Sequence, residues 1–219
     1  MLAHRALRML ILGLAVGLSS AALWAFREFV PPRPGNANTF PCKDAHPAEK
    51  VTAAIDLYNT APKDQIFITP YSQEGILPVL LIISNDGDQP ITVNNMQAEL
   101  VTARNTKLES LTTDDVFRRV AHISGSSTTP QRVGPIPLPG NTKNKKAQKQ
   151  YEEILNARFA AEAVEPHTTR SGFLFFDVLD VKQPVDGAHL YITGLRDAGG
   201  NELMYFEIPA VVANAAIGR

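Results

Sequence analysis

The sequence predicts a mainly β protein in which antiparallel strands form a β-sandwich. The strongest observation is the stretch 76–102. Its apolar run at 79–83 is too short for a membrane span and rich in strand-forming residues. Turn-favouring residues follow at 85–90, and apolar and polar residues alternate again at 96–100. This order predicts a buried central strand, a turn and a half-exposed partner strand.

Short strand-like segments recur along the chain and are the second observation. They lie at 51–56, 65–69, 107–111, 171–178, 189–193 and 202–208. Glycines within 197–201 permit positive φ between the last two segments, which predicts a hairpin there. Roughly seven to nine strands at this spacing predict an immunoglobulin-like arrangement, although the Cys…Trp…Cys pattern of true immunoglobulin domains is missing.

The predicted core is built from apolar residues of these strands. Its candidates are Val79, Leu81, Ile83, Phe173, Phe175, Leu190, Ile192, Met204 and Phe206. Which residues of 79–83 face inward stays open, because a strand buried on both faces does not alternate.

A change of hydrophobic period between the strands is the third observation, and it predicts a two-helix excursion. Thr112 or Thr113 can cap a first helix at 114–122. Asp114 and Asp115 lie in its first turn, where the helix dipole favours acidic side chains.

The second helix of the excursion is predicted at 144–163, after a Ser-, Thr-, Pro- and Gly-rich loop at 124–142. Lys149 and Glu153 are spaced for an i,i+4 ion pair. The apolar face of this helix comprises Ala147, Tyr151, Ile154, Leu155, Arg158 and Phe159. We expect the whole excursion, 112–163, to pack on one face of a sheet.

The first residues follow the pattern of an export signal. Residues 1–8 are basic and lack acids, and residues 9–26 are uncharged and just long enough to span a bilayer. Small residues at Ser20 and Ala22 suit cleavage after Ala22, whereas Trp24 suits a retained interfacial anchor. Both outcomes stay open, and either places the rest of the chain outside the cytoplasm, in the periplasm or at the cell surface.

These segments predict the domain organisation. It comprises a signal peptide or signal anchor at 1–28, a Pro-rich linker at 29–45, the β-sandwich with its helical insertion at 46–212, and a tail at 213–219.

Composition excludes several classes of protein. From Pro31 onward 18 basic residues face 21 acidic ones, so the basic excess typical of nucleic-acid binding is missing. The single cysteine, Cys42, allows neither an intramolecular disulfide nor a zinc site built on several cysteines. Cys42 is interpreted as a buried or tethered loop residue, with an intermolecular disulfide or a reactive thiol as the alternative.

Local motifs predict no catalytic, metal or cofactor site. The five histidines lack metal-ligand spacing, and no Gly-rich phosphate loop is present. Asp86-Gly87-Asp88 lacks the spaced acids and distal Glu of a calcium loop, so we interpret it as a turn. The hydroxyl cluster at 124–129 has no nearby base and no nucleophile elbow.

The most distinctive charged feature is a basic run beside the loop of the excursion. It consists of Arg132, Lys143, Lys145, Lys146 and Lys149. A solvated helix start is one interpretation. Contact with anionic lipid headgroups or a cell-wall polymer is the other, since lysines at a helix N-terminus oppose the macrodipole.

Three segments carry a family resemblance: 77–88 (LPVLLIISNDGD), 164–176 (VEPHTTRSGFLFF) and 189–208. They resemble exported bacterial modules of unknown function with a telokin-like immunoglobulin-type sandwich. The resemblance implies an extracytoplasmic domain and carries no catalytic residues across. The excursion departs from that pattern.

Two functional hypotheses follow. The first is a non-catalytic exported or membrane-tethered module of the cell envelope. Its partner would be an envelope protein, an anionic lipid or a cell-wall polymer. If residues 9–26 are uncleaved, they would also hold the module in the membrane. The alternative is an extracytoplasmic small-ligand-binding protein or hydrolase. Its site would be assembled around His122 and Asp114 or Asp115, with a hydroxyl from 124–129.

Overall fold

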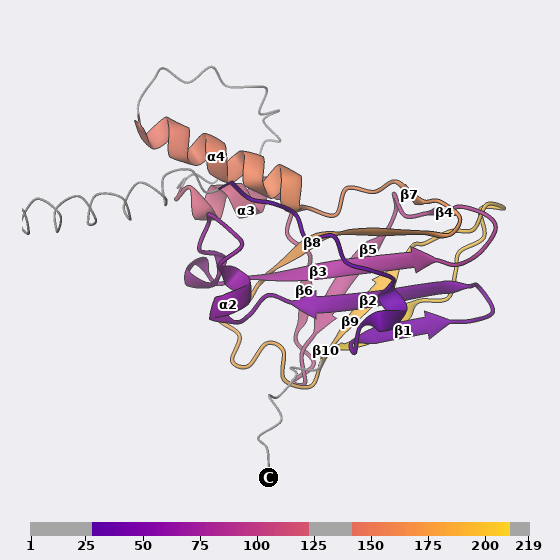
Figure 1. Cartoon of the computed structure of the whole chain (residues 1–219). Coiled ribbons are helices and arrows are strands. Elements are labelled where there is room, and N and C mark those ends of the chain that lie inside the picture. The colour runs from indigo at the N-terminus through magenta and orange to yellow at the C-terminus, as the bar shows by residue number, and fades with distance from the viewer. Residues whose placement is uncertain (1–27, 123–141, 211–219) are drawn as a thin grey trace, which may run out of the picture. The chain divides into compact units, whose positions relative to one another are not determined.

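A computed structural model describes residues 28–122 and 142–210 (Figure 1). The residues from Pro31 onward belong to one compact unit, which is described below. Its strands are β1 (Lys43–His46), β2 (Val51–Leu57), β3 (Ile76–Asn85), β4 (Ile91–Thr92), β5 (Gln97–Val101), β6 (Lys107–Glu109), β7 (Ala163–Val164), β8 (Thr168–Asp177), β9 (Ala188–Thr193) and β10 (Phe206–Ala210). Its helices are η2 (Ala37–Thr39), α2 (Ala61–Asp64), η3 (Tyr71–Glu74), α3 (Thr113–Val120) and α4 (Thr142–Ala157).

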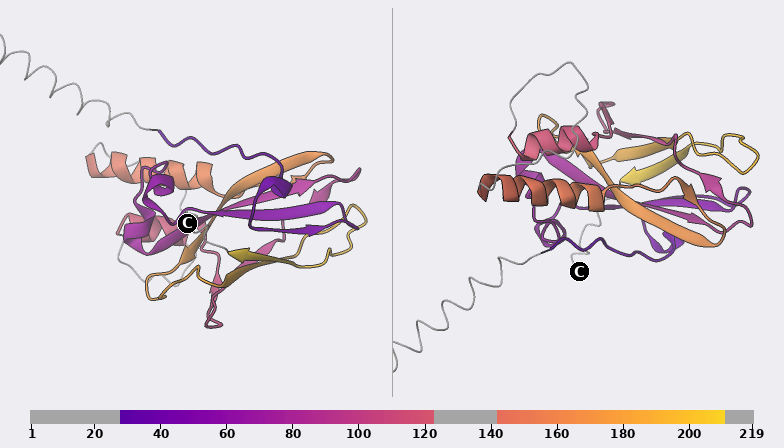
Figure 2. Two further views of the ribbon diagram at one scale, coloured as in Figure 1. Left: turned by 60° about the horizontal axis from the view of Figure 1, so that its bottom comes forward. Right: turned by 90° about the horizontal axis from the view of Figure 1, so that it is seen from above.

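The strands form two four-stranded antiparallel sheets, ordered β1-β2-β3-β8 and β10-β9-β5-β6, with a small β4–β7 ladder beside them. The two sheets lie as layers over a shared apolar core (Figure 2). This mainly β architecture with few helices is consistent with the predicted β-sandwich.

Strand β3 is buried along its whole length because it lies between β2 and β8 and is covered on both faces. Val79, Leu81 and Ile83 face the core shared by the two sheets. The alternate residues, Leu80 and Ile82, are equally buried on the outer face. The assignment of faces that the sequence left open is thereby settled.

The predicted core residues are buried with one exception. Met204 is 64% exposed, because β10 begins only at Phe206 and the turn before it is longer than the sequence pattern predicted. Phe173 and Phe175 are buried outside the shared core, in an aromatic cluster on the outer face of β3 and β8 with Tyr58, Phe67 and Tyr71.

The hairpin predicted between β3 and the segment at 96–100 is wrong. Strand β5 pairs with β6 and β9 in the opposite sheet, so the turn after β3 carries the chain across the sandwich. Asn85 organises this turn: its side-chain amide donates to the Gln89 and Val164 carbonyls, and its Oδ1 accepts from Gly87 N–H. The β9–β10 hairpin is observed as predicted, with Gly200 at φ 83° in its turn.

Two further segments differ from expectation. Residues 65–69 form a loop after α2 rather than a strand, and their backbone N–H groups serve the excursion, as described below. Residues 37–46, which the sequence placed largely in the linker, include η2 and β1. The Ala37 N–H donates to Ser84 Oγ of β3 at 2.8 Å, so this segment is part of the folded unit. Cys42 is buried in the core.

Candidate functional site

The excursion begins and ends at the same edge of β8. Before it, Leu111 N–H donates to the Phe175 carbonyl at 2.7 Å, and after it, Phe159 N–H donates to the Phe173 carbonyl at 2.9 Å. These two carbonyls are roughly 7 Å apart along the strand. Gly172 permits the close approach, since a Cβ there would lie 2.4 Å from Phe159 Cα.

Helices α3 and α4 pack against each other and against the segment between α2 and η3, at one end of the strands (Figures 1 and 2). The Phe117 and Tyr151 rings meet edge to face at 5.1 Å, and Gln150 Nε2 donates to the Val120 carbonyl. An Arg119–Asp177 ion pair joins α3 to β8 and lowers the pKa of the Asp177 carboxyl. The predicted packing along one sheet face is therefore replaced by a helical cap at the end of the strands.

The predicted i,i+4 pair between Lys149 and Glu153 is not formed. Glu153 is only 2% exposed and accepts the backbone N–H groups of Ile68 and Thr69, the latter at 3.1 Å. Burial raises the pKa of the Glu153 carboxyl, and the two N–H donors oppose part of that shift. Burial also raises the pKa of the Tyr71 phenol beside it, and the charge of Glu153 adds to the effect.

The buried face of α4 is rotated relative to the predicted one. Gln150, Glu153, Ile154 and Ala157 are buried, whereas Leu155 is 36% exposed. Helix α4 also ends at Ala157, six residues before the predicted end. The predicted face was wrong because two of the buried residues, Gln150 and Glu153, are polar. Each forms a hydrogen bond with backbone groups distant along the chain, and such contacts leave no sign in the hydrophobic pattern of the helix.

The basic residues of the excursion gather on the first half of α4. Lys145, Lys146 and Lys149 are exposed, and none forms an ion pair within the described part of the chain. Lys143 lies on α4, but its side chain is outside the description, and Arg132 lies outside the described residues.

Helical geometry shows why these lysines are exposed. Lys146 shares a face with Gln150, Glu153 and Ala157 at i+4, i+7 and i+11, and those three are buried. Lys146 itself is exposed, so the first turns of α4 extend beyond what the rest of the cap covers (Figure 1). Lys145, Lys146 and Lys149 lie within about 100° of one another around the helix axis, so their charges face solvent on one side of α4.

The alternative site around His122 is not assembled among the described residues. Asp114 and Asp115 lie in the first turn of the eight-residue α3 and His122 lies past its end, about 12 Å away along the axis. Asp115 accepts from its capping residue Thr112, whereas His122 Nε2 lies 3.5 Å from Glu74 Oε1. The hydroxyl cluster at 124–129 is outside the described residues.

The other titratable groups singled out in the sequence lie apart. Asp88 pairs with Lys50 and His167, which lowers the pKa of the Asp88 carboxyl, while Asp86 accepts from asparagine side chains. His46 lies between two carboxylates at the β1–β10 seam. Within residues 28–122 and 142–210, no three His, Cys, Asp or Glu side chains are grouped to hold a metal ion. No described helix is both long and apolar enough to cross a membrane.

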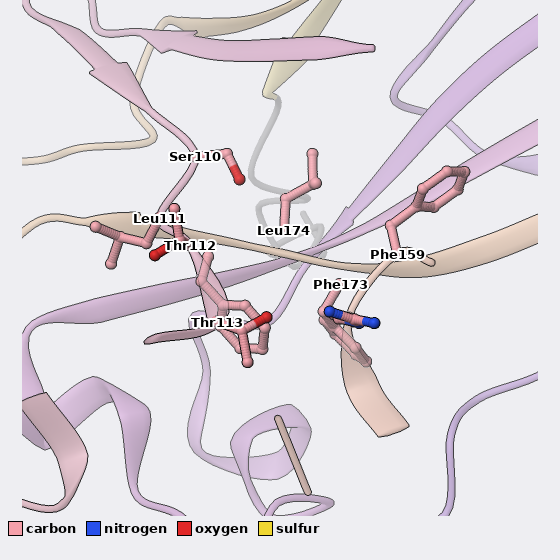
Figure 3. Close-up of a pocket in the computed structure, with 9 residues that line it drawn as sticks. Ser110, Leu111, Thr112, Thr113, Phe159, Phe173 and Leu174 are labelled. Carbon is pink, nitrogen blue, oxygen red and sulfur yellow. The ribbon is translucent and has the colours of Figure 1, made fainter. Parts of the chain in front are cut away.

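A hollow that the sequence did not predict lies where the excursion joins β8 (Figure 3). Its volume is about 320 Å³. Its lining, called the β8 notch below, consists of Ser110, Leu111, Thr112, Thr113, Arg158, Phe159, Phe173, Leu174 and Phe175. Three separate segments contribute, so residue spacing gave no signal, and Arg158 had been assigned to the apolar face of α4.

Comparison with known proteins places the chain in no family: no family model and no curated protein matches it. Among solved structures, MPT63, a secreted protein from Mycobacterium tuberculosis, is similar at 12% identity with a TM-score of 0.34. The alignment covers 81% of this chain and 98% of MPT63.

Proposed function

We propose that this protein is a non-catalytic binding module of the cell envelope whose helical cap contacts an anionic surface. The observation that carries the proposal is the set of exposed, unpaired lysines on the projecting turns of α4: Lys145, Lys146 and Lys149. Lys143 adds a fourth positive charge to the same helix. The export-type segment at 1–28 and the resemblance to telokin-like immunoglobulin-type modules support a location outside the cytoplasm, anchored or secreted.

Electrostatics favour a polyanionic partner. Lysines in the first turns of a helix oppose its dipole, so their accumulation there does not serve the stability of α4. Each basic residue near an anionic membrane contributes about 1 kcal/mol, and the attraction is screened within roughly 8–10 Å at physiological salt. Four such charges sustain weak, salt-sensitive attachment to lipid headgroups or to an anionic wall polymer.

Co-sedimentation of the full-length chain tests this proposal. The four lysines at 143, 145, 146 and 149 are changed together to glutamine. The matched control changes Arg33, Arg104, Arg170 and Lys182 to glutamine; these are exposed, lie outside α4 and form no ion pair within the described residues. Both variants lose the same net charge, so only the position of that charge differs.

We expect wild type and the control variant to sediment with anionic vesicles or with isolated cell wall at low salt. The α4 variant should lose the salt-sensitive part of that binding. Separate vesicle and wall arms tell lipid from polymer, and zwitterionic vesicles measure binding through the apolar segment. Equal binding by all three proteins, or no salt-sensitive binding by any, would leave the lysines as a solvated helix face.

The alternative of a hydrolase around His122, Asp114 and Asp115 has no support in the described residues, since α3 separates these groups.

A further inference from the structure

We infer that helix α4 is held closed by a proton-dependent latch, a largely buried cluster formed by Asp64, Thr69, Tyr71 and Glu153. In the closed state, α4 packs on the loop at 68–69 and the cluster holds a proton. Loss of that proton lets α4 separate from the loop more often. The latch concerns how α4 is held, so it goes beyond the proposed attachment of the α4 lysines to an anionic surface.

The Glu153 carboxylate joins α4 to a loop that is distant along the chain. Its two oxygens accept the backbone N–H groups of Ile68 and Thr69, the latter at 3.1 Å. Glu153 is 2% exposed and Thr69 is 1% exposed, so the contact is closed to water. Helix α4 cannot move away from the loop without breaking both bonds, and the protection of these two N–H groups therefore reports whether the latch is closed.

Two hydroxyl groups lie beside the carboxylate. The Tyr71 side chain is fully buried, and neither its hydroxyl nor that of Thr69 is in hydrogen-bonding geometry within the described part of the chain. Both still lie near enough to Glu153 to lower the pKa of its carboxyl, and the charge of Glu153 raises the pKa of the Tyr71 phenol. Their oxygens can accept a hydrogen bond from a protonated Glu153, so the cluster can hold the proton internally.

The other charge in the cluster is also acidic. The charge of Asp64, on α2, raises the pKa of the same Tyr71 phenol. One carboxylate oxygen of Asp64, Oδ1, is buried and has no hydrogen-bond partner among the described residues. Within residues 28–122 and 142–210, no basic side chain pairs with either Asp64 or Glu153. Buried acids without a counter-charge favour the protonated form.

The elements packed around the cluster add no counter-charge to it. The loop at 65–70 has no titratable side chain, and Lys149, one turn before Glu153 on α4, is exposed. On η3, Glu74 lies beside His122. The basic side chains of α2 and α3 form their ion pairs elsewhere or form none in the described part of the chain: Lys63 with Asp56, Arg119 with Asp177, and Arg118 with no acid.

Burial decides the sign of the pH dependence. It raises the pKa of the Glu153 carboxyl in the closed state, and the N–H and hydroxyl donors oppose only part of that effect. When α4 separates from the loop, the carboxyl meets water and its pKa returns towards the ordinary value of 4.5. The closed state therefore binds the proton more tightly, and the fraction of closed molecules falls as pH rises through the closed-state pKa.

Amide hydrogen exchange of the full-length chain at Ile68 and Thr69, from about pH 5 to 8, tests the latch. Dividing each rate by the intrinsic rate at the same pH removes the chemical effect of pH. Exchange at Leu81, in the buried strand β3, reports global unfolding. The decisive variant is Glu153→Gln, which cannot titrate, and its matched control is Glu152→Gln, an exposed neighbour on α4.

We expect the protection of Ile68 and Thr69 to fall severalfold as pH rises in wild type and in Glu152→Gln, and to stay below that of Leu81 throughout. Glu153→Gln should show no such slope, whatever its absolute protection, because an amide offers one acceptor oxygen instead of two. Tyr71→Phe removes a hydroxyl that lowers the pKa of Glu153, so in this variant the fall should move to higher pH.

A flat profile or a rise in protection with pH in wild type would overturn the inference. So would equal slopes in wild type and Glu153→Gln, a move to lower pH in Tyr71→Phe, or protection at Ile68 and Thr69 equal to that of Leu81. None of these measurements involves vesicles or cell wall, so failure of the latch is distinguishable from failure of the proposed function.

Discussion

At the scale of single residues, two positions hold the excursion in place. Gly172 allows the chain leaving α4 to run against β8, and Glu153 fastens α4 to the loop at 68–69. Neither role is visible in the sequence, because each depends on backbone distant along the chain. Glu153 lies four residues after Lys149, which is the spacing of a surface ion pair on a helix, so the sequence predicted that pair.

Replacing Gly172 by alanine should destabilise the domain. The new Cβ would lie 2.4 Å from Phe159 Cα and 2.6 Å from its N, so the backbone itself must shift. We expect a loss of about 1–3 kcal/mol in the free energy of unfolding, measured by urea denaturation. Gly35→Ala is the control, since nothing lies within 4 Å of its added Cβ. Similar stabilities for the two variants would contradict the close approach.

Glu153 should make stability depend on pH with a defined sign. Because burial raises its pKa in the folded state above the ordinary value of 4.5, folding favours the protonated carboxyl. Its stabilising contribution is complete below the unfolded-state pKa and is lost as pH rises through the folded-state pKa.

Glu153→Gln removes this titration. The free energy of unfolding of wild type minus that of the variant should therefore fall as pH rises from about 4 to 7. Chemical denaturation at several pH values measures the difference. A constant difference, or one that grows with pH, would show that Glu153 is not held in a desolvated environment.

At the scale of elements, the sequence predicted where the strands lie more accurately than it predicted which strands pair with each other. Segments at 51–56, 79–83 and 189–193 lie in β2, β3 and β9, because strand propensity and burial are local signals. The hairpin after β3 was wrong, since a turn sequence does not tell whether the chain pairs back or crosses to the other sheet. Residues 65–69 were misassigned because Phe67 is buried from a loop, against Phe173 and Tyr71, rather than from within a strand.

Leu81 offers a test of the β3 packing. It is fully buried in the shared core, opposite Ile55 of β2 and Gly172 of β8. Leu81→Ala should lower the free energy of unfolding by about 2–5 kcal/mol, as expected for a cavity in a packed core. The same change at Leu155, which is 36% exposed on α4, should cost much less. Comparable losses at both positions in a denaturation experiment would argue against the burial of Leu81 in the shared core.

At the scale of the whole molecule, two antiparallel sheets carry a helical cap at one end, and the proposed contact with an anionic surface belongs to that cap. The sequence predicted the excursion and its lysines, because charge runs and helical periodicity are local. It did not predict the β8 notch, because Ser110, Arg158 and Phe173 come together only when the excursion returns to the strand it left. The hollow is therefore formed by the way the chain leaves β8 and returns to it, and not by a sequence motif.

The proposed binding to an envelope partner requires the domain to lie outside the cytoplasm. The most direct test of that location is whether the N-terminal segment exports a fused reporter. Residues 1–40 are joined to an alkaline phosphatase that is active only after export, with Leu12→Arg and Val16→Arg in the control to interrupt the uncharged stretch. High phosphatase activity from the native sequence and loss of activity in the control is the predicted result. Activity no higher than that of the control would place the domain in the cytoplasm and contradict its role as an envelope module.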